Sequence, residues 1–366
     1  MNVRHFFQFC TLCILFAGFT ACNNRRAGTS DYYVLPLDKY IADGNTQTTL
    51  NEIADRMQII PVETSDSALF AALVVCGVVG DEVFFSDRDA VYAVQRESGK
   101  VRTVIDRKGE GPGYYPYFVS AFLEGDTLLR VRSMPGFYEY DLKGNFRNSF
   151  QIDSVANFIV TADKKRYAVF RPTLVKDAAI GIYDEDWNLL RKGLRNTHTK
   201  TSVYIEFPIA VFDNKYFFNV AYTDTVYQIT EKRDIPYLVL QRGDYACKSD
   251  VFASGVVDFY NLNCIFSPFY TLIDNYCFLG YLYRGKYYYD IWKVDTGELL
   301  HRYIADDPDD RYMLPVRVND IDMKVAFRYA KGSRLYCEIS PDDVLKLFPT
   351  APEDTNPMLL EIELKN

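Results

Sequence analysis

Three glycines at alternate positions, Gly109, Gly111 and Gly113, are the first residues whose type and spacing suggest chemistry. A glycine-rich turn can present backbone N–H groups to a phosphate when a helix follows it. Here Pro112 has no N–H, no helical pattern follows, and no Lys-Ser or Lys-Thr pair ends the run. The spacing therefore predicts a turn whose backbone needs φ values that glycine tolerates, rather than a phosphate site.

Histidine-based catalytic and metal-binding patterns are missing from the sequence. After the first 21 residues only His198 and His301 remain, and there is no HExxH, GxSxG or Cys-His pattern. We therefore expect neither a histidine metal centre nor a Ser-His-Asp triad, and we predict no metal and no cofactor. His301 falls in the outer strand of a predicted hairpin, where we expect it to be exposed.

Cys22 has a different chemistry open to it. It follows small residues and an apolar stretch over 6–18, with Arg4 in front. That stretch is too short to span a bilayer comfortably and is typical of a signal peptide. The segment resembles a bacterial lipobox, which implies cleavage before Cys22, acylation of its thiol and a membrane anchor of fatty chains. An ordinary secretory signal with an incidental cysteine is the alternative.

These features predict three segments: a lipoprotein signal peptide over 1–21, a polar lipid-bearing tether over 22–48, and a folded domain over 49–366. Residues 23–26 contain no acid, whereas surface-exported lipoproteins tend to carry acids there. We therefore expect an outer-membrane lipoprotein of the cell envelope on the periplasmic face, with the cell surface as the other possibility.

Composition narrows the class of protein. The chain has 366 residues, 48% of them hydrophobic, which is enough for a substantial core. The formal net charge is -8 and no basic stripe is present, so we do not expect a nucleic-acid partner. With 29 Tyr and 26 Phe the chain is rich in residues that favour strands.

A strand–turn–strand pattern recurs along the chain. The turns fall at Gly99, Gly144, Asn188 and Lys232, which are 44 or 45 residues apart, and then 65 residues later at Gly297. A repeat of 40–50 residues built from four strands is characteristic of β-propeller blades. The hairpins themselves cover 91–106, 137–152, 180–194, 226–240 and 288–304.

The two ends of the domain complete the predicted architecture. Residues 324–339 and 358–364 read as strands of a sixth unit, and 340–348 as a short helix that begins at Ser340. The strand at 57–63 has no partner in its own unit. We predict an all-β, six-bladed β-propeller that closes when this early strand pairs with the last blade, which removes open sheet edges. A β-sandwich is the alternative.

Five cysteines remain in the folded region, and their number is odd. They are Cys76, Cys247, Cys264, Cys277 and Cys337. Most lie in apolar contexts typical of small buried side chains. A disulfide between Cys264 and Cys277 is possible in an oxidising periplasm.

Three segments carry a family resemblance. The run at 105–117, the opening at 50–69 and the Asn-Pro closing strand at 355–366 are similar to the six-bladed β-propeller lipoproteins of gut Gram-negative bacteria. Tyr114 stands where an acid is usual in that family. The resemblance covers about residues 49–366 and implies the fold and the location, but not a reaction.

The candidate ligand-binding residues are aromatic. They are Tyr114, Tyr115 and Tyr117 after the glycine turn, and Phe266, Phe269 and Tyr270 in an insertion at 252–270. Rigid rings with polar tips give contact area at low entropic cost. We therefore expect a membrane-anchored binding or scaffold module for an envelope protein, peptide or glycan. A carboxylate-based hydrolase or lyase at the mouth of the propeller channel is the alternative.

Overall fold

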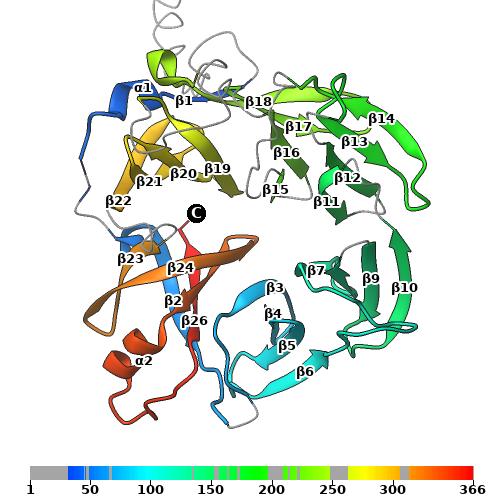
Figure 1. The fold of residues 1–366 in the computed structure, drawn as a ribbon. Helices are drawn as coiled ribbons and strands as arrows, with labels where there is room; N and C mark the ends of the chain where they lie inside the picture. The colour runs from blue at the N-terminus through cyan, green and yellow to red at the C-terminus, as the bar shows by residue number, and fades with distance from the viewer. Residues whose placement is uncertain are drawn as a thin grey trace, which may run out of the picture.

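The computed structural model describes residues 32–44, 46, 49–65, 68–133, 136–151, 156–162, 165–170, 174–196, 209–212, 215–220, 223–247, 263–305 and 313–365. Within them, six sheets of four or five strands stand around a central axis, and helix is nearly absent (Figure 1). Each sheet forms one blade. The predicted all-β class and six-bladed arrangement are therefore confirmed.

Each of the first three blades is a four-stranded antiparallel sheet whose strands follow one another in the sequence. Blade 1 contains β3 (Val74–Val79), β4 (Glu82–Asp87), β5 (Ala90–Gln95) and β6 (Val101–Ile105). Blade 2 contains β7 (Ser120–Glu124), β8 (Leu128–Arg132), β9 (Gly136–Asp141) and β10 (Phe146–Gln151). Blade 3 contains β11 (Ala156–Ala162), β12 (Lys165–Phe170), β13 (Ile180–Tyr183) and β14 (Leu189–Gly193).

Blades 4 and 6 each gain a fifth strand from the N-terminal part of the domain. Blade 4 contains β15 (Ile209–Phe212), β16 (Lys215–Asn219), β17 (Thr225–Ile229), β18 (Asp234–Leu240) and β1 (Tyr33–Leu35). Blade 5 contains β19 (Phe266–Ile273), β20 (Tyr276–Tyr283), β21 (Lys286–Lys293) and β22 (Glu298–Ala305). Blade 6 contains β23 (Met313–Val318), β24 (Ile321–Lys331), β25 (Arg334–Ile339), β26 (Met358–Leu364) and β2 (Ala54–Ile60).

The two added strands pair differently. β1 lies parallel to β18, with Val34 opposite Val239, and this pairing had no sequence signal. β2 lies antiparallel to β26, with Met57 opposite Ile362. The early strand predicted at 57–63 therefore does pair with the last strand of the chain.

Strand order gives the ring two distinct faces. In an antiparallel four-stranded blade, the turns between strands 1 and 2 and between strands 3 and 4 lie on one side, here called the hairpin face. The turns between strands 2 and 3, and the segments that cross to the next blade, lie on the other side, here called the crossing face. Lys331, at the end of β24, shows this arrangement. Its Nζ donates to Val78 O (2.7 Å) near the β3–β4 turn and contacts Asp126 (2.8 Å) in the β7–β8 turn.

The five predicted hairpins are confirmed, and local chemistry explains their turns. Gly144, between β9 and β10, has φ +80, and a Cβ added there would lie 1.8 Å from Val104 O. Glycine is therefore required both for the backbone conformation and for the close approach to β6 of the preceding blade. The strands β3, β7, β11, β15 and β19 lie nearest the axis, and β6, β10, β14, β18 and β22 lie on the outside of their blades (Figure 1).

The hydrophobic core lies between neighbouring blades. Phe84 of blade 1 packs in one cluster with Leu129 and Tyr140 of blade 2, and all three are fully buried. Phe278 of blade 5 shares another cluster with Val325 of blade 6. Each blade therefore buries its faces against both neighbours, as expected for a propeller.

The first described segment belongs to the folded domain. Leu35 at the end of β1 and Leu37 at the start of α1 (Leu37–Tyr40) are fully buried. A short 3₁₀ helix, η1 (Leu50–Glu52), then leads into β2. The predicted tether over 22–48 is therefore too long at its C-terminal end, because residues around 33–41 pack on blades 4 and 5. Cys22 lies outside the described residues.

The predicted C-terminal helix is confirmed as α2 (Pro341–Leu347). The Asp343 N–H donates to Ser340 Oγ (3.2 Å), which caps the helix, and Pro341 occupies the first turn. Among the residues that the structure describes, no helix is long and apolar enough to cross a membrane.

Candidate functional site

The glycine turn lies in the segment that crosses from β6 to β7, on the crossing face. Gly109, Gly111 and Gly113 have φ values of +153, +119 and +76. A Cβ at Gly113 would lie 2.9 Å from the Phe146 ring. No helix follows the turn, so its role as a blade crossing is confirmed.

Two buried tyrosines hold this turn from below. The Tyr115 hydroxyl donates to Asp89 O (2.5 Å), and the Tyr140 hydroxyl donates to Gly113 O (2.9 Å). Tyr115 is fully buried, and burial raises the pKa of its hydroxyl to about 12. Tyr115, one of the predicted ligand-binding residues, therefore belongs to the core.

The other two tyrosines after the turn point outward. Tyr114 is 41% exposed and Tyr117 is 64% exposed. The Arg107 guanidinium lies 5.9 Å from the centre of the Tyr114 ring, which is within cation–π range. These two rings are supported by a rigid turn and remain available for contact.

Further apolar side chains are exposed on the same face. Of the eleven large apolar residues that are exposed in the described chain, seven lie on blade crossings, on strand ends next to them, or on a connection between the second and third strands of a blade, counted from the axis. We call them the crossing-face residues: Leu69, Val74, Tyr114, Tyr117, Val119, Leu174 and Phe348. Only the two tyrosines were predicted from sequence. The other residues could have been found from their position between predicted blades, because a segment that crosses from an outer strand to the next inner strand runs over the surface.

Charged groups lie among these apolar residues. Lys108 Nζ contacts Asp89 Oδ2 (2.7 Å), and the Arg88 side chain is 75% exposed in the turn between β4 and β5. The crossing face of blades 1 and 2 thus combines aromatic rings with hydrogen-bonding side chains. Such a surface can contact an apolar ligand face while satisfying polar groups around it.

The second predicted group is only partly on this face. Phe266 begins β19 and is half-buried, whereas Tyr270 is 3% exposed in the cluster between blades 4 and 5. Burial raises the pKa of the Tyr270 hydroxyl well above its usual value. Phe269 pairs with Gly280 through its backbone, and its side chain lies outside the described residues, as do residues 252–262 of the predicted insertion.

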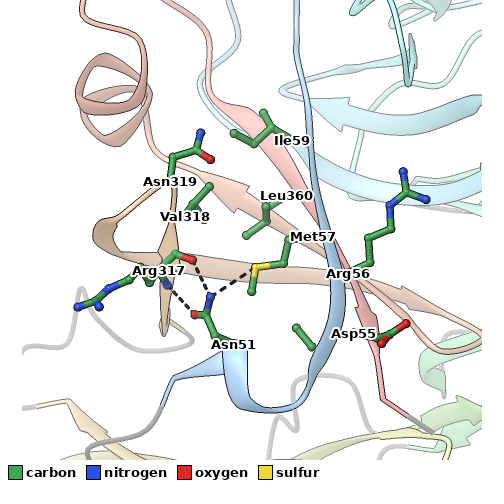
Figure 2. Close-up of a pocket in the computed structure, with 10 residues that line it drawn as sticks. Asn51, Asp55, Arg56, Met57, Ile59, Arg317, Val318, Asn319 and Leu360 are labelled. Atoms are coloured by element: carbon green, nitrogen blue, oxygen red, sulfur yellow. Dashed lines mark hydrogen bonds between the residues drawn. The ribbon is translucent and has the colours of Figure 1, made fainter.

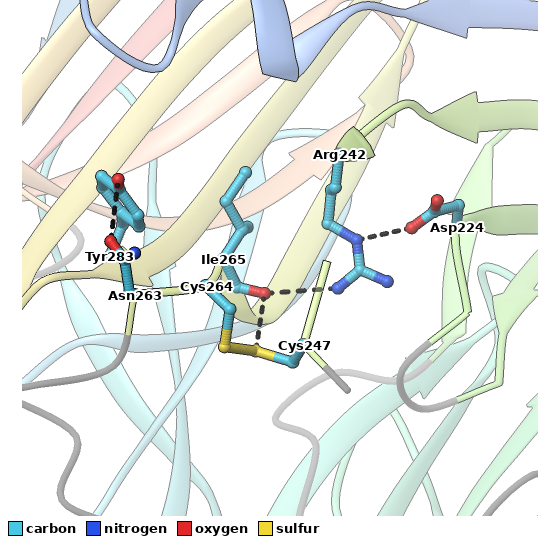
Figure 3. The surroundings of a disulfide bond; sticks show 7 residues. All are labelled: Asp224, Arg242, Cys247, Asn263, Cys264, Ile265 and Tyr283. Atoms are coloured by element: carbon cyan, nitrogen blue, oxygen red, sulfur yellow. Dashed lines mark hydrogen bonds and ion pairs between the residues drawn. A yellow bond between two sulfur atoms is a disulfide. The ribbon is translucent and has the colours of Figure 1, made fainter. Parts of the chain in front are cut away.

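A disulfide joins a residue just before that insertion to a residue within it (Figure 3). Cys247 and Cys264 are bonded, with their Cα atoms 5.0 Å apart. Cys264 therefore does not pair with Cys277, the partner that the sequence left possible. Cys277 is a fully buried free thiol within β20, and burial raises its pKa. Cys264 instead lies just before β19, in the segment that connects blade 4 to blade 5. Cys76 and Cys337 are buried and free, as predicted.

Arg242 holds the chain next to the disulfide. Its Nε donates to Asp224 Oδ1 (2.6 Å) and its Nη1 donates to Ile265 O (3.3 Å). Figure 3 shows these contacts on one side of the sulfur atoms. The base of the insertion is therefore fixed by a covalent bond and a buried guanidinium on the crossing face.

A cavity of about 420 Å³ lies between β2 and the β23–β24 hairpin (Figure 2). The Asn51 side chain donates to Arg317 O (2.7 Å) and accepts from the Arg317 N–H (2.8 Å), as a strand neighbour would. The Arg317 side chain is paired with Asp322. These polar groups satisfy one another, so we assign the cavity a structural role.

The strongest buried polar cluster lies within blade 5. Arg302 Nη2 donates to Tyr281 Oη (2.9 Å), and Tyr281 donates to Asp290 Oδ2 (3.0 Å). Burial lowers the pKa of Arg302, but its hydrogen bonds to Asp290 outweigh burial and raise it. The guanidinium therefore stays charged, and the cluster is closed to solvent.

Carboxylates are scarce beside the channel. Among the described residues of the innermost strands β3, β7, β11, β15 and β19, and of 326–331 in β24, only Glu124 carries one. Glu124 forms an ion pair with Arg130, which also contacts Glu139. A pair of free carboxylates of the kind that glycoside hydrolases use is not found on these strands.

The remaining sequence features give no reactive centre in the described part of the chain. No group of three or more His, Cys, Asp or Glu side chains is placed to hold a metal ion there. His301 is 8% exposed, so the expectation of an exposed side chain is wrong, and burial lowers its pKa. His198 and the acidic run at 306–310 lie outside the described residues.

Comparison with known proteins gives the following matches. The family model "Domain of unknown function (DUF4934)" matches residues 32–365. A protein described as exported, from Bacteroides fragilis, superposes with a TM-score of 0.68 at 12% identity, covering 88% of this chain and 98% of that one. The extracellular domain of a one-component system from B. thetaiotaomicron gives 0.44 at 11% identity, covering 83% and 40%. No curated protein matched. These structural similarities bear on the fold alone.

Proposed function

We propose that this chain, which belongs to the DUF4934 family, is an exported propeller held at the cell envelope that binds a protein, peptide or glycan through its crossing face. The observation that carries the proposal is the concentration of exposed apolar side chains there. Seven of eleven share this face, and Tyr114 and Tyr117 stand on a turn held by buried hydroxyls. Exposed apolar residues that gather on one side mark interaction surfaces.

Binding without turnover fits the chemistry of the described residues better than catalysis. The alternative from sequence, a hydrolase or lyase at the channel mouth, needs two free carboxylates there. Glu124 is the single described carboxylate on the innermost strands, and it forms an ion pair with Arg130. We therefore place the function in recognition.

The location at the envelope is also a proposal. The Cys247–Cys264 disulfide supports it, because disulfides persist in oxidising compartments outside the cytosol. The lipobox-like segment before Cys22 supports attachment to a membrane through fatty chains on that cysteine. We propose that Cys22 is acylated, that the protein is attached to the outer membrane, and that it faces the periplasm.

We further propose that the pairing of β2 with β26 closes the ring. The support is their antiparallel register over Ala54–Ile60. Arg96 of blade 1 also forms an ion pair with Glu361 of blade 6 (2.5 Å), across the interface between these two blades. In this arrangement blade 6 draws its strands from both ends of the domain.

Capture from an envelope extract tests the binding face. Wild-type protein on beads should retain a ligand that the Tyr114→Ala/Tyr117→Ala double variant loses by at least about tenfold, since each aromatic contact contributes about 1 kcal/mol. Leu190→Ala, at an exposed site on the outer strand β14, is the matched control and should retain the ligand. Equal loss in the control, or equal retention by all three, would reject the crossing face.

Lipid labelling tests the anchor. Labelled palmitate should enter the wild-type protein and not Cys22→Ser, and added protease should spare the protein in intact cells. Equal labelling of the variant would reject acylation of Cys22. Rapid proteolysis in intact cells would indicate that the protein is exposed on the cell surface. Turnover of a glycan or peptide that depends on Glu124 would favour the hydrolase alternative.

A further inference from the structure

The Tyr114 ring lies across the glycine turn on the crossing face. A Cβ added at Gly109 would lie 3.4 Å from Tyr114 Cδ1, and one added at Gly111 would lie 3.9 Å from Tyr114 Cδ2. The Tyr114 N–H also donates to Gly111 O (3.1 Å). Both edges of the ring therefore lie close to backbone that carries no side chain, while Tyr114 as a whole remains 41% exposed. The turn thus supports the ring as a flat, accessible surface.

An accessible ion pair lies next to this turn. Lys108 precedes Gly109, and its Nζ lies 2.7 Å from Asp89 Oδ2; the two side chains are 48% and 46% exposed. Asp89 is also held through its backbone, because its carbonyl oxygen accepts the hydroxyl of the buried Tyr115. In the described part of the chain the pair has no further side-chain partner. One Asp89 oxygen can therefore accept, and two Lys108 N–H groups can donate, to a ligand.

The charges around the ring nearly cancel. The crossing segment over 105–117 carries two acids and two bases, and the β4–β5 turn over 87–89 carries two acids and one base. Their formal charges sum to -1, from four acids against three bases. Arg88 in that turn lies 3.8 Å from Asp87, and Arg107 lies over the Tyr114 ring. A charged ligand would meet no large excess of the opposite sign, so charge complementarity favours an uncharged one.

The same features disfavour a protein or peptide partner. The cores of protein interfaces are depleted of Lys and Asp. A close-packed protein would remove the Lys108–Asp89 pair from water, and that desolvation is repaid only if further hydrogen bonds form. A peptide that binds by strand addition needs a free strand edge. The described crossing segment instead forms an isolated bridge between Lys108 and Tyr115.

We propose that the crossing face binds an uncharged glycan, with a sugar ring stacked on Tyr114 and two neighbouring hydroxyls bound by Lys108 and Asp89. A sugar ring has an apolar C–H face, which can stack on an aromatic ring, and a rim of hydroxyls that both donate and accept. Two adjacent hydroxyls can accept from the ammonium and donate to the carboxylate. The ion pair then exchanges water for hydroxyls and keeps its hydrogen bonds. Glycan binding in this form presupposes that the crossing face is the binding face, and it adds the chemical class of the ligand.

Capture from a treated envelope extract separates the ligand classes. One part of the extract is left untreated, a second is digested with proteinase K, and a third is oxidised with periodate, which cleaves the bond between carbons that carry neighbouring hydroxyls. Wild-type protein on beads should retain carbohydrate, measured with phenol and sulfuric acid, from the untreated and digested extracts but not from the oxidised one. Retention that digestion abolishes would identify a protein or peptide and overturn the glycan, while the crossing face would stand as the binding face.

Calorimetric titration of the intact folded protein tests defined sugars. The probes are cellohexaose, xylohexaose, mannohexaose and maltohexaose, with hexagalacturonic acid as the charged reference. We expect saturable binding of at least one uncharged hexasaccharide, with the same affinity at low and high salt, because the ligand carries no charge to be screened. The charged reference should bind more weakly. Failure of all four uncharged hexasaccharides to bind, or tighter and salt-sensitive binding of hexagalacturonic acid, would overturn the proposal.

Two single variants locate the glycan on this face. Lys108→Met keeps side-chain length and removes the donors, and Tyr114→Ala removes the ring. Each should lower the affinity for the hexasaccharide about tenfold. Because an exposed ion pair adds little to stability, the melting temperature of Lys108→Met should stay unchanged.

Lys331→Met is the matched control for the loss of an ion pair. Lys331 is 43% exposed and contacts Asp126 (2.8 Å), but it lies on the hairpin face, so its removal should leave glycan binding unchanged. An equal loss of affinity in Lys331→Met, or unchanged affinity in both Lys108→Met and Tyr114→Ala, would place the glycan elsewhere and overturn the proposal.

Discussion

Asp290 and Arg302 lie directly opposite each other on β21 and β22, and both side chains are completely buried. Arg302 Nε lies 2.7 Å from Asp290 Oδ1 and Nη2 lies 2.6 Å from Oδ2, so the contact is bidentate. The Arg302 guanidinium also donates to Tyr40 O, and its backbone pairs with Thr46. One residue therefore connects the outer strand of blade 5 to the N-terminal segment.

Removal of one member of this pair should be strongly destabilising. Asp290→Ala leaves a buried guanidinium without its counter-ion, and we expect a loss of about 3–5 kcal/mol in the free energy of unfolding. Urea denaturation measures it. The double variant Asp290→Leu/Arg302→Met removes both charges and should recover much of the loss. Equal effects of the single and double changes would show that packing, rather than charge, is responsible.

The disulfide should stabilise the domain through its closed loop. Cys247 and Cys264 are 17 residues apart, and opening a loop of about that length costs about 3 kcal/mol in the chain-entropy account. The melting temperature of the wild type should fall on addition of a reductant. Cys247→Ser/Cys264→Ser should melt at the lower temperature with or without reductant. A reductant effect that persists in this variant would point to another disulfide.

Gly113 should be far less tolerant of substitution than another glycine with positive φ. Gly113→Ala places a methyl group 2.9 Å from Phe146 in addition to the backbone strain, and we expect a loss of about 2–5 kcal/mol. Gly125 has φ +53 with open space around it, so Gly125→Ala should cost about 1–2 kcal/mol from strain alone. Chemical denaturation compares the two, and similar losses would contradict the tight packing of the turn.

Stability should decline steeply at alkaline pH. Burial raises the pKa values of Tyr115, Tyr237 and Tyr329 to about 12 in the folded protein. The unfolded chain ionises its tyrosines near pH 10, so stability that is complete below that pH is lost between about pH 10 and 12. Tyrosinate absorbance and circular dichroism should change together over this range. Ionisation of all tyrosines near pH 10 without unfolding would contradict the burial.

Ring closure can be tested by truncation at the C-terminus. Deletion of residues 355–366 removes β26, which separates β25 from β2 and pairs with both. We expect exposed strand edges, aggregation and rapid proteolysis. A chain that ends at Leu364 keeps the strand and serves as the control. Unchanged melting of the longer deletion would mean that β26 does not close the ring.

Sequence periodicity was sufficient for the blades but not for contacts between distant segments. The hairpin turns at Gly99 and Gly144 and the cap at Ser340 depend on a few neighbouring residues, so their patterns predicted them. The parallel pairing of β1 with β18 joins residues about 200 apart, and three residues of apolar sequence carry no partner information.

The candidate site was predictable only in part for the same reason. Tyr114 and Tyr117 follow a recognisable turn, whereas nothing local to Tyr115 or Tyr270 shows that their rings are enclosed by strands of the neighbouring sheet. Cys264 bonds to Cys247 rather than to Cys277 because Cys247 and Cys264 both lie between β18 and β19, whereas Cys277 lies within β20.

The path of the N-terminal segment sets the order in which the molecule would yield to mechanical force. From β1 on blade 4, the chain passes Arg302 on blade 5 and then enters β2 on blade 6. Tension applied ahead of residue 32 would first load the three residue pairs of β1, next the carbonyl contacts of Arg302, and last the longer β2–β26 ladder. A pull from the N-terminal side therefore loads these two attachments before it reaches the ring, and a force-extension trace should record their release as small steps ahead of the main rupture.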